Sequence, residues 1–248
     1  MNVLECYDAN GELSVIRKWF NMITTPLDKA QSIDQLHKEA KNTTGKPGSR
    51  MLEYLQRATD STKSEPGLTR AECLAVLMYT DDNDARAFFN EYNKASRERK
   101  WEPYRIYTTL LTSALRKLAE SNPLPPSTHL YRGLGSRLGP PTACRLFWKS
   151  FTSTSLDYET ARDNFAGSDG IILKFEPPVS YYAAQVGQLS TYLEDEVILL
   201  PFEAFDFMGA IGQEFSFKTS KAQELFASFH AQSESSEMPS YMHSAKYL

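Results

Sequence analysis

Several features that would assign this 248-residue sequence to a membrane or nucleic-acid-binding class are missing. No apolar run approaches the roughly 18 residues of a membrane-spanning helix, so we expect no membrane span. Lysine and arginine number 27 against 31 aspartate and glutamate, which gives a net charge of −4, and there is no basic block. This balance argues against nucleic acid or an anionic membrane as the main partner.

Cysteine and histidine are also scarce. The three cysteines, Cys6, Cys73 and Cys144, are widely separated and cannot all pair, which fits neither a disulfide framework nor a metal site. The histidines share no ligand spacing, so we expect no metal. The first residues lack the cationic start and apolar core of a signal peptide. We therefore expect a protein that stays in the cytoplasm, or is exported by a route without such a signal.

The apolar content, 41%, is sufficient for a substantial core. Residues 1–65 mix short amphipathic patterns with breakers and are interpreted as an accessory helical segment. Thr69 and Glu72 form a capping box that predicts the start of a helix. Apolar spacing then predicts three consecutive helices over residues 69–119.

From Thr128 the pattern changes to short apolar runs separated by glycine, proline and aspartate, one of them over residues 147–153, which is typical of strands. One helix is expected between Ser155 and Ala166, and short helices are expected near residues 13–23 and 222–229. The predicted class is α+β: an N-terminal helical layer followed by a mainly antiparallel β-sandwich over residues 128–210. Residues 66–217 would form the main domain. Residues 218–248, rich in serine and weakly apolar, are predicted to be a flexible tail.

The acidic run Glu194-Asp195-Glu196 directly precedes the aliphatic run 197–200. Because alternate strand residues share a face, Glu194 and Glu196 point the same way and Asp195 points to the other side. Two such carboxylates suit a reaction in which one stabilises an oxocarbenium-like sugar cation and the other takes a proton. An acidic strand end facing solvent is the simpler alternative. A glycosidase is another, although no broad aromatic sugar platform is evident.

Two earlier strand-like segments carry polar groups where apolar ones are expected. Arg132 ends an apolar strand, where its planar guanidinium suits a phosphate or ribose edge, or else a structural salt bridge. Gly133 leaves the backbone open to a flat ligand. Ser153 lies on the face opposite its two threonine neighbours, so its hydroxyl can point to a ligand.

Taken together, these segments resemble the arginine-specific mono-ADP-ribosyltransferases, in particular their vertebrate ecto-enzyme branch. Ser153, within Phe151-Thr-Ser-Thr-Ser155, follows Arg132 of Tyr-Arg-Gly by 21 residues, and Glu196 of Glu-Asp-Glu follows Ser153 by 43. The stretches from Gly67 to Thr80 and from Glu196 to Phe205 extend the resemblance, which covers roughly residues 66–210.

The resemblance implies an NAD cleft in the β-sandwich and a role for each motif residue. Arg132 would anchor the phosphate and ribose, and the Gly133 backbone would contact the nicotinamide amide. Ser153 would brace the nicotinamide ribose and the catalytic acid, with Thr154 beside it also assigned to NAD binding. Glu196 would bind the ribose 2′-hydroxyl and stabilise the oxocarbenium. Glu194 would orient and deprotonate the acceptor guanidine.

The resemblance also implies a protein partner modified on arginine, recognised through Glu194 and through the loop that carries Gln185, Gln188 and Tyr192. NAD+ would be a substrate, and no cofactor is expected. Because bacterial effectors share the three-part motif, a toxin-like role and export as an effector stay open. The alternatives are an NAD+ glycohydrolase, in which water replaces the guanidine, and an inactive module that binds NAD or a partner.

Overall fold

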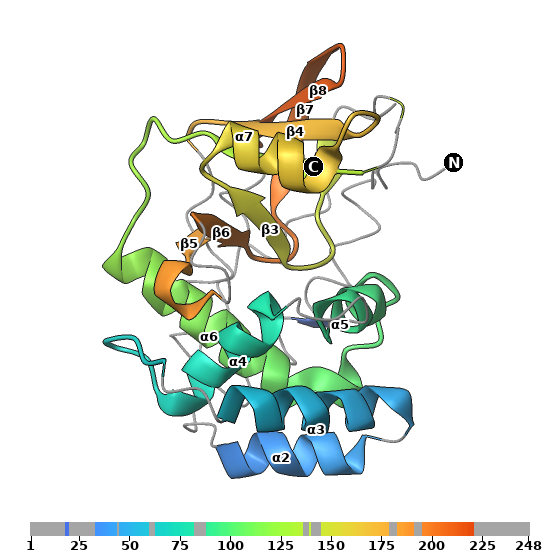
Figure 1. The fold of residues 1–248 in the computed structure, drawn as a ribbon, viewed down its shortest axis with the longest axis vertical. Coiled ribbons are helices and arrows are strands. Elements are labelled where there is room, and N and C mark those ends of the chain that lie inside the picture. The colour runs from blue at the N-terminus through green and yellow to red at the C-terminus, as the bar shows by residue number, and fades with distance from the viewer. Residues whose placement is uncertain are drawn as a thin grey trace, which may run out of the picture.

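The computed structural model describes residues 18–19, 33–43, 45–59, 63–81, 88–135, 139, 145–178, 183–190 and 195–220. The helices that precede residue 122 gather at one end of the molecule, and the strands lie at the other end together with the short helix that follows Asp157 (Figure 1). The predicted α+β class, with helices preceding mainly antiparallel strands, is confirmed.

The helical end consists of α2 (Ile33–Asn42), α3 (Lys46–Thr59), α4 (Arg70–Thr80), α5 (Phe88–Arg97) and α6 (Arg105–Ser121), with a 3-10 turn, η1 (Glu102–Tyr104), before α6. Helix α4 is buried from Ala71 to Thr80, whereas α2, α3 and α5 are amphipathic and cover it and α6. Apolar side chains of α2 and α3 belong to the same core as those of α4 and α6. The segment predicted to be accessory thus contributes to the main helical core.

The predicted capping box opens α4. The Thr69 hydroxyl accepts a hydrogen bond from Glu72 N at 3.2 Å, and Thr69 N donates to Glu72 Oε2 at 2.7 Å. Ser113 and Lys117 of α6 donate to the same carboxylate at 2.6 and 2.7 Å. Burial alone would raise the pKa of Glu72, but these hydrogen bonds and the lysine charge outweigh it and lower that pKa. The cap therefore fixes α4 against α6.

A second carboxylate ties α2 to the beginning of α6. Glu39 of α2 accepts hydrogen bonds from the backbone N–H groups of Ile106 at 2.5 Å and Tyr107 at 3.0 Å, two donors in the first turn of α6. Burial nevertheless raises the pKa of Glu39 to about 7, against the lowering effect of these donors and of Arg105. The contact therefore joins Glu39 to two residues that lie 67 and 68 positions later in the chain.

In the part of the chain that the structure describes, eight strands form one hydrogen-bonded sheet in the order β2-β7-β8-β4-β1-β3-β6-β5. Every neighbouring pair is antiparallel except β4 and β8, which run parallel. The strands are β1 (Leu130–Leu134), β2 (Arg145–Phe147), β3 (Thr152–Ser155), β4 (Ile171–Glu176), β5 (Ala184–Gln185), β6 (Glu196–Leu199), β7 (Ala204–Ile211) and β8 (Glu214–Thr219).

Two apolar clusters show that this sheet curls over on itself. Ile198 of β6 packs in the helical core, whereas Val197 and Leu199 point to the opposite face. There they share a cluster with Phe175 of β4 and Phe217 of β8, far along the strand order. The interior is therefore sandwich-like, and the β3–β6 region has the helices on one side and the rest of the sheet on the other.

The structure differs from the sequence expectation in three elements. The run 147–153, expected to be one strand, splits into the end of β2 and the beginning of β3, because β2 pairs with β7 while β3 pairs with β6. Strand β8 was not predicted. The helix expected between Ser155 and Ala166 is present as a short turn, α7 (Tyr158–Thr160), capped by Asp157, followed by a π-helix, η2 (Ala161–Ala166). The helices expected near residues 13–23 and 222–229 fall largely or wholly outside the described residues.

Candidate active site

A cavity of about 430 Å³ lies between the helical layer and strands β1, β3 and β6, within the size range of ligand pockets. Its wall combines side chains from α4, α5, three strands, η2 and the segment before β6. The lining residues are Tyr79, Thr80, Phe89, Asn93, Tyr131, Arg132, Gly133, Ser153, Thr154, Ser155, Asn164, Phe165, Ser190 and Glu196. Three residues singled out in the sequence, Arg132, Ser153 and Glu196, thus line one cavity.

Strand register explains how the serine and the acid come together. Ser155 of β3 pairs with Glu196 of β6, and Ser153 pairs with Ile198, so these residues share one face of the sheet. That face is the helical side, because Ile198 packs in the helical core. Strand β1 pairs with the other edge of β3, where Tyr131 is opposite Ser155, and this brings Arg132 to the same cavity.

Arg132 is anchored to the backbone of the serine strand. Its Nη1 donates to the Ser153 carbonyl at 2.6 Å. Burial lowers the pKa of Arg132, but a guanidinium starts from so high a value that it keeps its charge. The negative charge of Glu196 acts in the opposite direction and favours the cation. A fixed cation with further N–H donors in a planar fork suits a phosphate or another anionic group.

Hydrogen bonds from the segment just before β6 hold Glu196 in place. Ser190 donates its hydroxyl proton to Glu196 Oε2 at 3.1 Å, and Val186 N donates to the Glu196 carbonyl at 3.1 Å. Lys63 in turn donates to the Ser190 carbonyl, and Thr80 at the end of α4 donates to the Leu189 carbonyl at 3.3 Å. The carboxylate is therefore oriented by a segment that is itself fixed to the helical layer.

Gly133 allows the π-helix η2 to approach β1 closely. A Cβ atom at this position would lie 2.0 Å from the Ala161 carbonyl oxygen and 2.6 Å from Ala166 N, distances that only glycine tolerates. The π-turn places Asn164 and Phe165 in the cavity wall, where Phe165 is half exposed. Such π-turns occur frequently at functional sites. An exposed aromatic ring beside an open backbone offers a surface for a flat ligand.

The helical layer contributes lining residues that were assigned no role from the sequence. Tyr79 of α4 and Asn93 of α5 are buried, and Asn93 Nδ2 donates to the Tyr79 hydroxyl at 3.1 Å. Both residues belong to helices whose apolar spacing marks them only as core positions. The sequence signal that could have found Asn93 is a buried amide on the apolar face of an amphipathic helix.

The remaining predicted site residues lie in different places. Thr154 lines the cavity, but its buried hydroxyl donates to the Val197 carbonyl at 2.8 Å, on the opposite face from Ser153. Gln185 accepts a hydrogen bond from Asn122 at 3.0 Å outside the cavity lining, and Gln188 is exposed in the 3-10 turn η3 (Gly187–Leu189). Glu194 and Tyr192 are outside the described residues.

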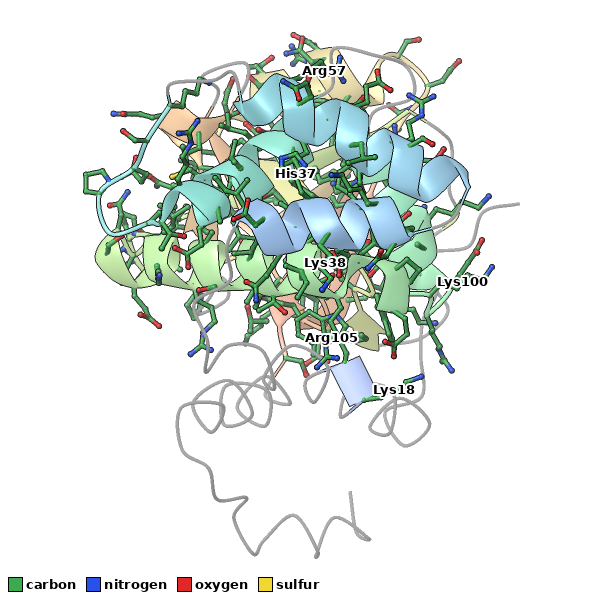
Figure 2. The ribbon with its side chains drawn as sticks, turned by 90° about the horizontal axis from the view of Figure 1, so that it is seen from below. Lys18, His37, Lys38, Arg57, Lys100 and Arg105 are labelled. Atoms are coloured by element: carbon green, nitrogen blue, oxygen red, sulfur yellow. The ribbon has the colours of Figure 1, made fainter. Side chains whose placement is uncertain are left out.

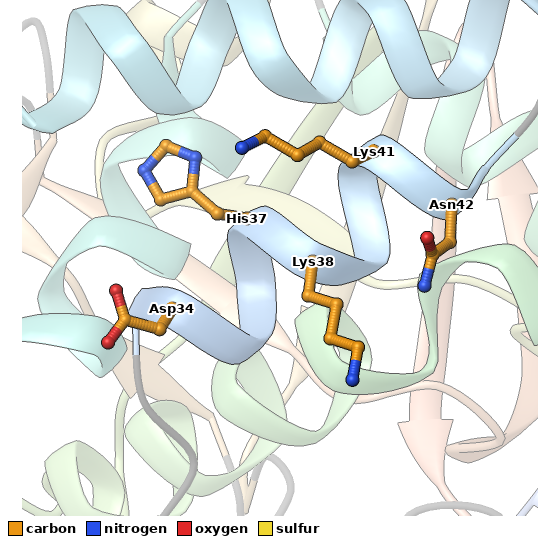
Figure 3. Close-up of a pocket in the computed structure, with 5 residues that line it drawn as sticks. All are labelled: Asp34, His37, Lys38, Lys41 and Asn42. Carbon is orange, nitrogen blue, oxygen red and sulfur yellow. The ribbon is translucent and has the colours of Figure 1, made fainter.

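A second hollow, on the far side of the helical layer, has a different character. It is lined by Asp34, His37, Lys38, Lys41 and Asn42, which all belong to α2, and most of them are exposed (Figure 3). Other basic side chains on this side, such as Arg57 and Arg105, are spread over α3 and the start of α6 (Figure 2). This hollow brings together no side chains from distant parts of the chain.

Within the described residues, no three His, Cys, Asp or Glu side chains are arranged to hold a metal ion. None of the helices described is long and apolar enough to span a lipid bilayer. Cys73 is a buried free thiol, and Cys6 and Cys144 are outside the described residues.

Comparison with known proteins identifies the class. Residues 26–221, more than three quarters of the chain, match the family described as NAD:arginine ADP-ribosyltransferase, and the chain belongs to that family. The match begins at residue 26, whereas the resemblance recognised in the sequence begins at about residue 66. No curated protein sequence matched.

Solved structures support the same fold at low sequence identity. The mono-ADP-ribosyltransferase ART2.2, described as eukaryotic, is similar with a TM-score of 0.52 and 18% identity, over 84% of this chain and 87% of that one. A mutant of ART2.2 in complex with NAD gives a TM-score of 0.53 at the same identity and coverage. Exoenzyme S from Pseudomonas aeruginosa, solved with human 14-3-3 protein beta and carba-NAD, gives 0.52 and 15%, over 88% and 98%. The protein is an ADP-ribosyltransferase by family and by fold.

Proposed function

We propose that this protein transfers ADP-ribose from NAD+ to an arginine side chain of a protein and releases nicotinamide. The observation that carries the proposal is the single cavity that Arg132, Ser153 and Glu196 line together. A fixed cation, a hydroxyl and an oriented carboxylate are the groups that a dinucleotide and a developing sugar cation require.

In the proposed reaction, the bond between C1′ of the ribose and N1 of nicotinamide breaks, and its electron pair leaves with neutral nicotinamide. The positive charge that remains is shared by C1′ and the ring oxygen. Glu196, oriented by Ser190, stabilises this oxocarbenium and accepts a hydrogen bond from the ribose 2′-hydroxyl. Arg132 binds the phosphates, while Ser153 braces the ribose.

The second half of the reaction forms a new bond from a guanidine nitrogen to C1′. An arginine is protonated at neutral pH, so one proton must be removed before its nitrogen can attack. Glu194 is the proposed base, on the basis of its position two residues before Glu196. The products are ADP-ribosylated arginine, nicotinamide and one proton.

The proposal is tested with NAD+ labelled in the adenylate half, agmatine as a small guanidine acceptor, and an arginine-rich protein. We expect a labelled agmatine adduct and an equal amount of nicotinamide. Free ADP-ribose with no adduct on either acceptor would replace the transferase by an NAD+ glycohydrolase. Absence of nicotinamide release would leave a module that binds without reacting.

A further inference from the structure

The turn η3, between β5 and β6, lies outside the strand pairing of the sheet. Its backbone N–H groups close on the turn itself, since Leu189 N donates to the Val186 carbonyl at 2.7 Å and Ser190 N donates to the same carbonyl at 3.2 Å. Hydrogen bonds between strands therefore do not set the position of this turn. Other contacts must fix it relative to the rest of the molecule.

These contacts come from the helical layer. Val186 and Leu189 are buried in the helical core, and Thr80 at the end of α4 donates its hydroxyl proton to the Leu189 carbonyl at 3.3 Å. The Nζ atom of Lys63, in the connection between α3 and α4, donates to the Ser190 carbonyl. Because a hydrogen bond from a charged donor is roughly twice as strong as a neutral one, the lysine should hold the turn more firmly than the threonine does.

The serine that binds the lysine also binds the proposed catalytic acid. Ser190 is 2% exposed and lines the cavity, and its hydroxyl donates to Glu196 Oε2 at 3.1 Å. The last torsion of a glutamate side chain has a broad energy minimum, so such a bond restricts how the carboxylate turns. Lys63 itself is outside the lining of the cavity. One residue therefore connects a lysine outside the cavity to the carboxylate within it.

We propose that Lys63 is a positioning residue for the reaction, which fixes the backbone of Ser190 and thereby the direction of the Glu196 carboxylate. Without the lysine, the turn is held less firmly against the helices, and the carboxylate loses its fixed orientation toward the ribose. The inference rests on the proposed function for its kinetic consequence. It gives the segment 1–65, predicted to be accessory, a part in the reaction.

Replacement of Lys63 by methionine keeps an unbranched side chain and removes the charged donor. Because Glu196 acts on the developing sugar cation, we expect kcat for nicotinamide release to fall about tenfold. The KM for NAD+ should change less than about twofold, since Arg132 keeps its contact with the Ser153 carbonyl. Lys63→Arg retains a charged N–H donor and should keep at least about half of the wild-type kcat. An unchanged kcat in Lys63→Met would overturn the proposal.

Lys38→Met is the matched control. Lys38 is an exposed lysine of α2 that lines the hollow on the far side of the helical layer. The substitution removes the same charge from the same face-forming set of helices, and kcat should stay at the wild-type value. Equal losses of kcat in Lys38→Met and Lys63→Met would overturn the proposal.

A double-mutant cycle with Ser190→Ala separates positioning from general destabilisation. If Lys63 acts through Ser190, the double variant releases nicotinamide no more slowly than Ser190→Ala alone, because the hydroxyl that transmits the effect is already absent. Losses of kcat that multiply would overturn the proposal.

Hydrogen–deuterium exchange measures the same link without any activity. Loss of the lysine should raise the exchange rates of the Leu189 and Ser190 amides at least about fivefold, whereas Lys38→Met should leave them unchanged. Unchanged exchange in Lys63→Met would overturn the link between the lysine and the turn. Absence of nicotinamide release by the wild-type protein would overturn the proposed function instead, and the exchange rates would still decide whether Lys63 fixes Ser190.

Discussion

Ser155 of β3 is paired directly with Glu196 of β6, and Ser153 lies two residues further along the same face. Backbone pairing therefore sets the separation between the serine and the acid. Because a sheet is stiffer than a loop, this arrangement keeps the two groups in place before any substrate arrives. Arg132 joins them from β1 and is held to the Ser153 carbonyl.

Variants of the two glutamates in the acidic run should affect the two halves of the proposed reaction differently. Glu196→Gln removes the charge that is proposed to stabilise the oxocarbenium, so nicotinamide release and transfer should both fall by at least about 100-fold. Glu194→Gln should lose transfer to agmatine and keep part of the hydrolysis, because the proposed role of Glu194 concerns only the acceptor. Chromatography of nicotinamide, ADP-ribose and the agmatine adduct measures all three.

Asp195→Asn is the control for these variants. Asp195 lies between the two glutamates in the sequence and its side chain is exposed. Its substitution removes one negative charge, as each of the glutamate substitutions does. It should retain both activities. Equal loss of hydrolysis and transfer in Glu194→Gln would contradict the separate roles.

Arg132→Lys should weaken the binding of NAD+. A lysine keeps the charge but lacks the planar fork that contacts the Ser153 carbonyl and could bind a phosphate at the same time. We expect the KM for NAD+ to rise about tenfold, which corresponds to about 1.4 kcal/mol. Arg105→Lys, outside the lining of this cavity, should leave KM unchanged. An unchanged KM in Arg132→Lys would remove Arg132 from NAD+ binding.

Gly133→Ala should displace the π-helix from β1. The added methyl group would lie 2.0 Å from the Ala161 carbonyl oxygen, a backbone atom that cannot move by itself. We expect a loss of roughly 1–3 kcal/mol in the free energy of unfolding, measured with urea, and a higher KM for NAD+. In Gly187→Ala the methyl group meets no atom within 4 Å, and both quantities should stay near wild type. Similar behaviour of the two variants would show that the close approach is unimportant.

The raised pKa of Glu39 should make stability depend on pH. Its folded-state pKa of about 7 lies above the ordinary value of 4.5, so the fold favours the protonated carboxyl. That contribution is fully present below pH 4.5 and is lost as the pH rises through 7, by at most about 3 kcal/mol. Glu39→Gln mimics the protonated form, so its stability relative to wild type should increase from pH 5 to pH 8.

Urea unfolding at pH 5, 6, 7 and 8 checks the Glu39 prediction. Glu53→Gln, at a more exposed carboxyl on α3, is the control and should run parallel to wild type. A parallel curve for Glu39→Gln as well would show that this carboxyl does not titrate across the range.

The strand motifs of the site were predictable because the alternation of side chains along a strand can be read directly from the order of residues. Glu196 precedes four aliphatic residues and therefore begins a buried strand, and Ser153 differs from its threonine neighbours in the face it occupies. The capping box at Thr69 was predictable for the same reason, since it is a local contact over three residues. Local chemistry of this kind needs no knowledge of the rest of the fold.

The helical contribution could not be predicted in this way. The contact between Tyr79 and Asn93 depends on how α4 and α5 pack, and the Glu39 contact depends on how α2 docks on α6. No spacing in the chain encodes either distance. Strand β8 was missed because its alternating Phe215 and Phe217 lie within a polar, serine-containing stretch near the tail.

The position of β8 inside the sheet has a consequence for biosynthesis. It is the last described strand along the chain, yet it lies between β7 and β4 and joins β2 and β7 to the remaining five strands. While the ribosome is still translating the codons for residues 214–219, the nascent chain can hold only two unconnected portions of the sheet. Closure of the sheet must therefore be a late event, and a ribosome stalled before residue 214 should carry a protease-sensitive intermediate.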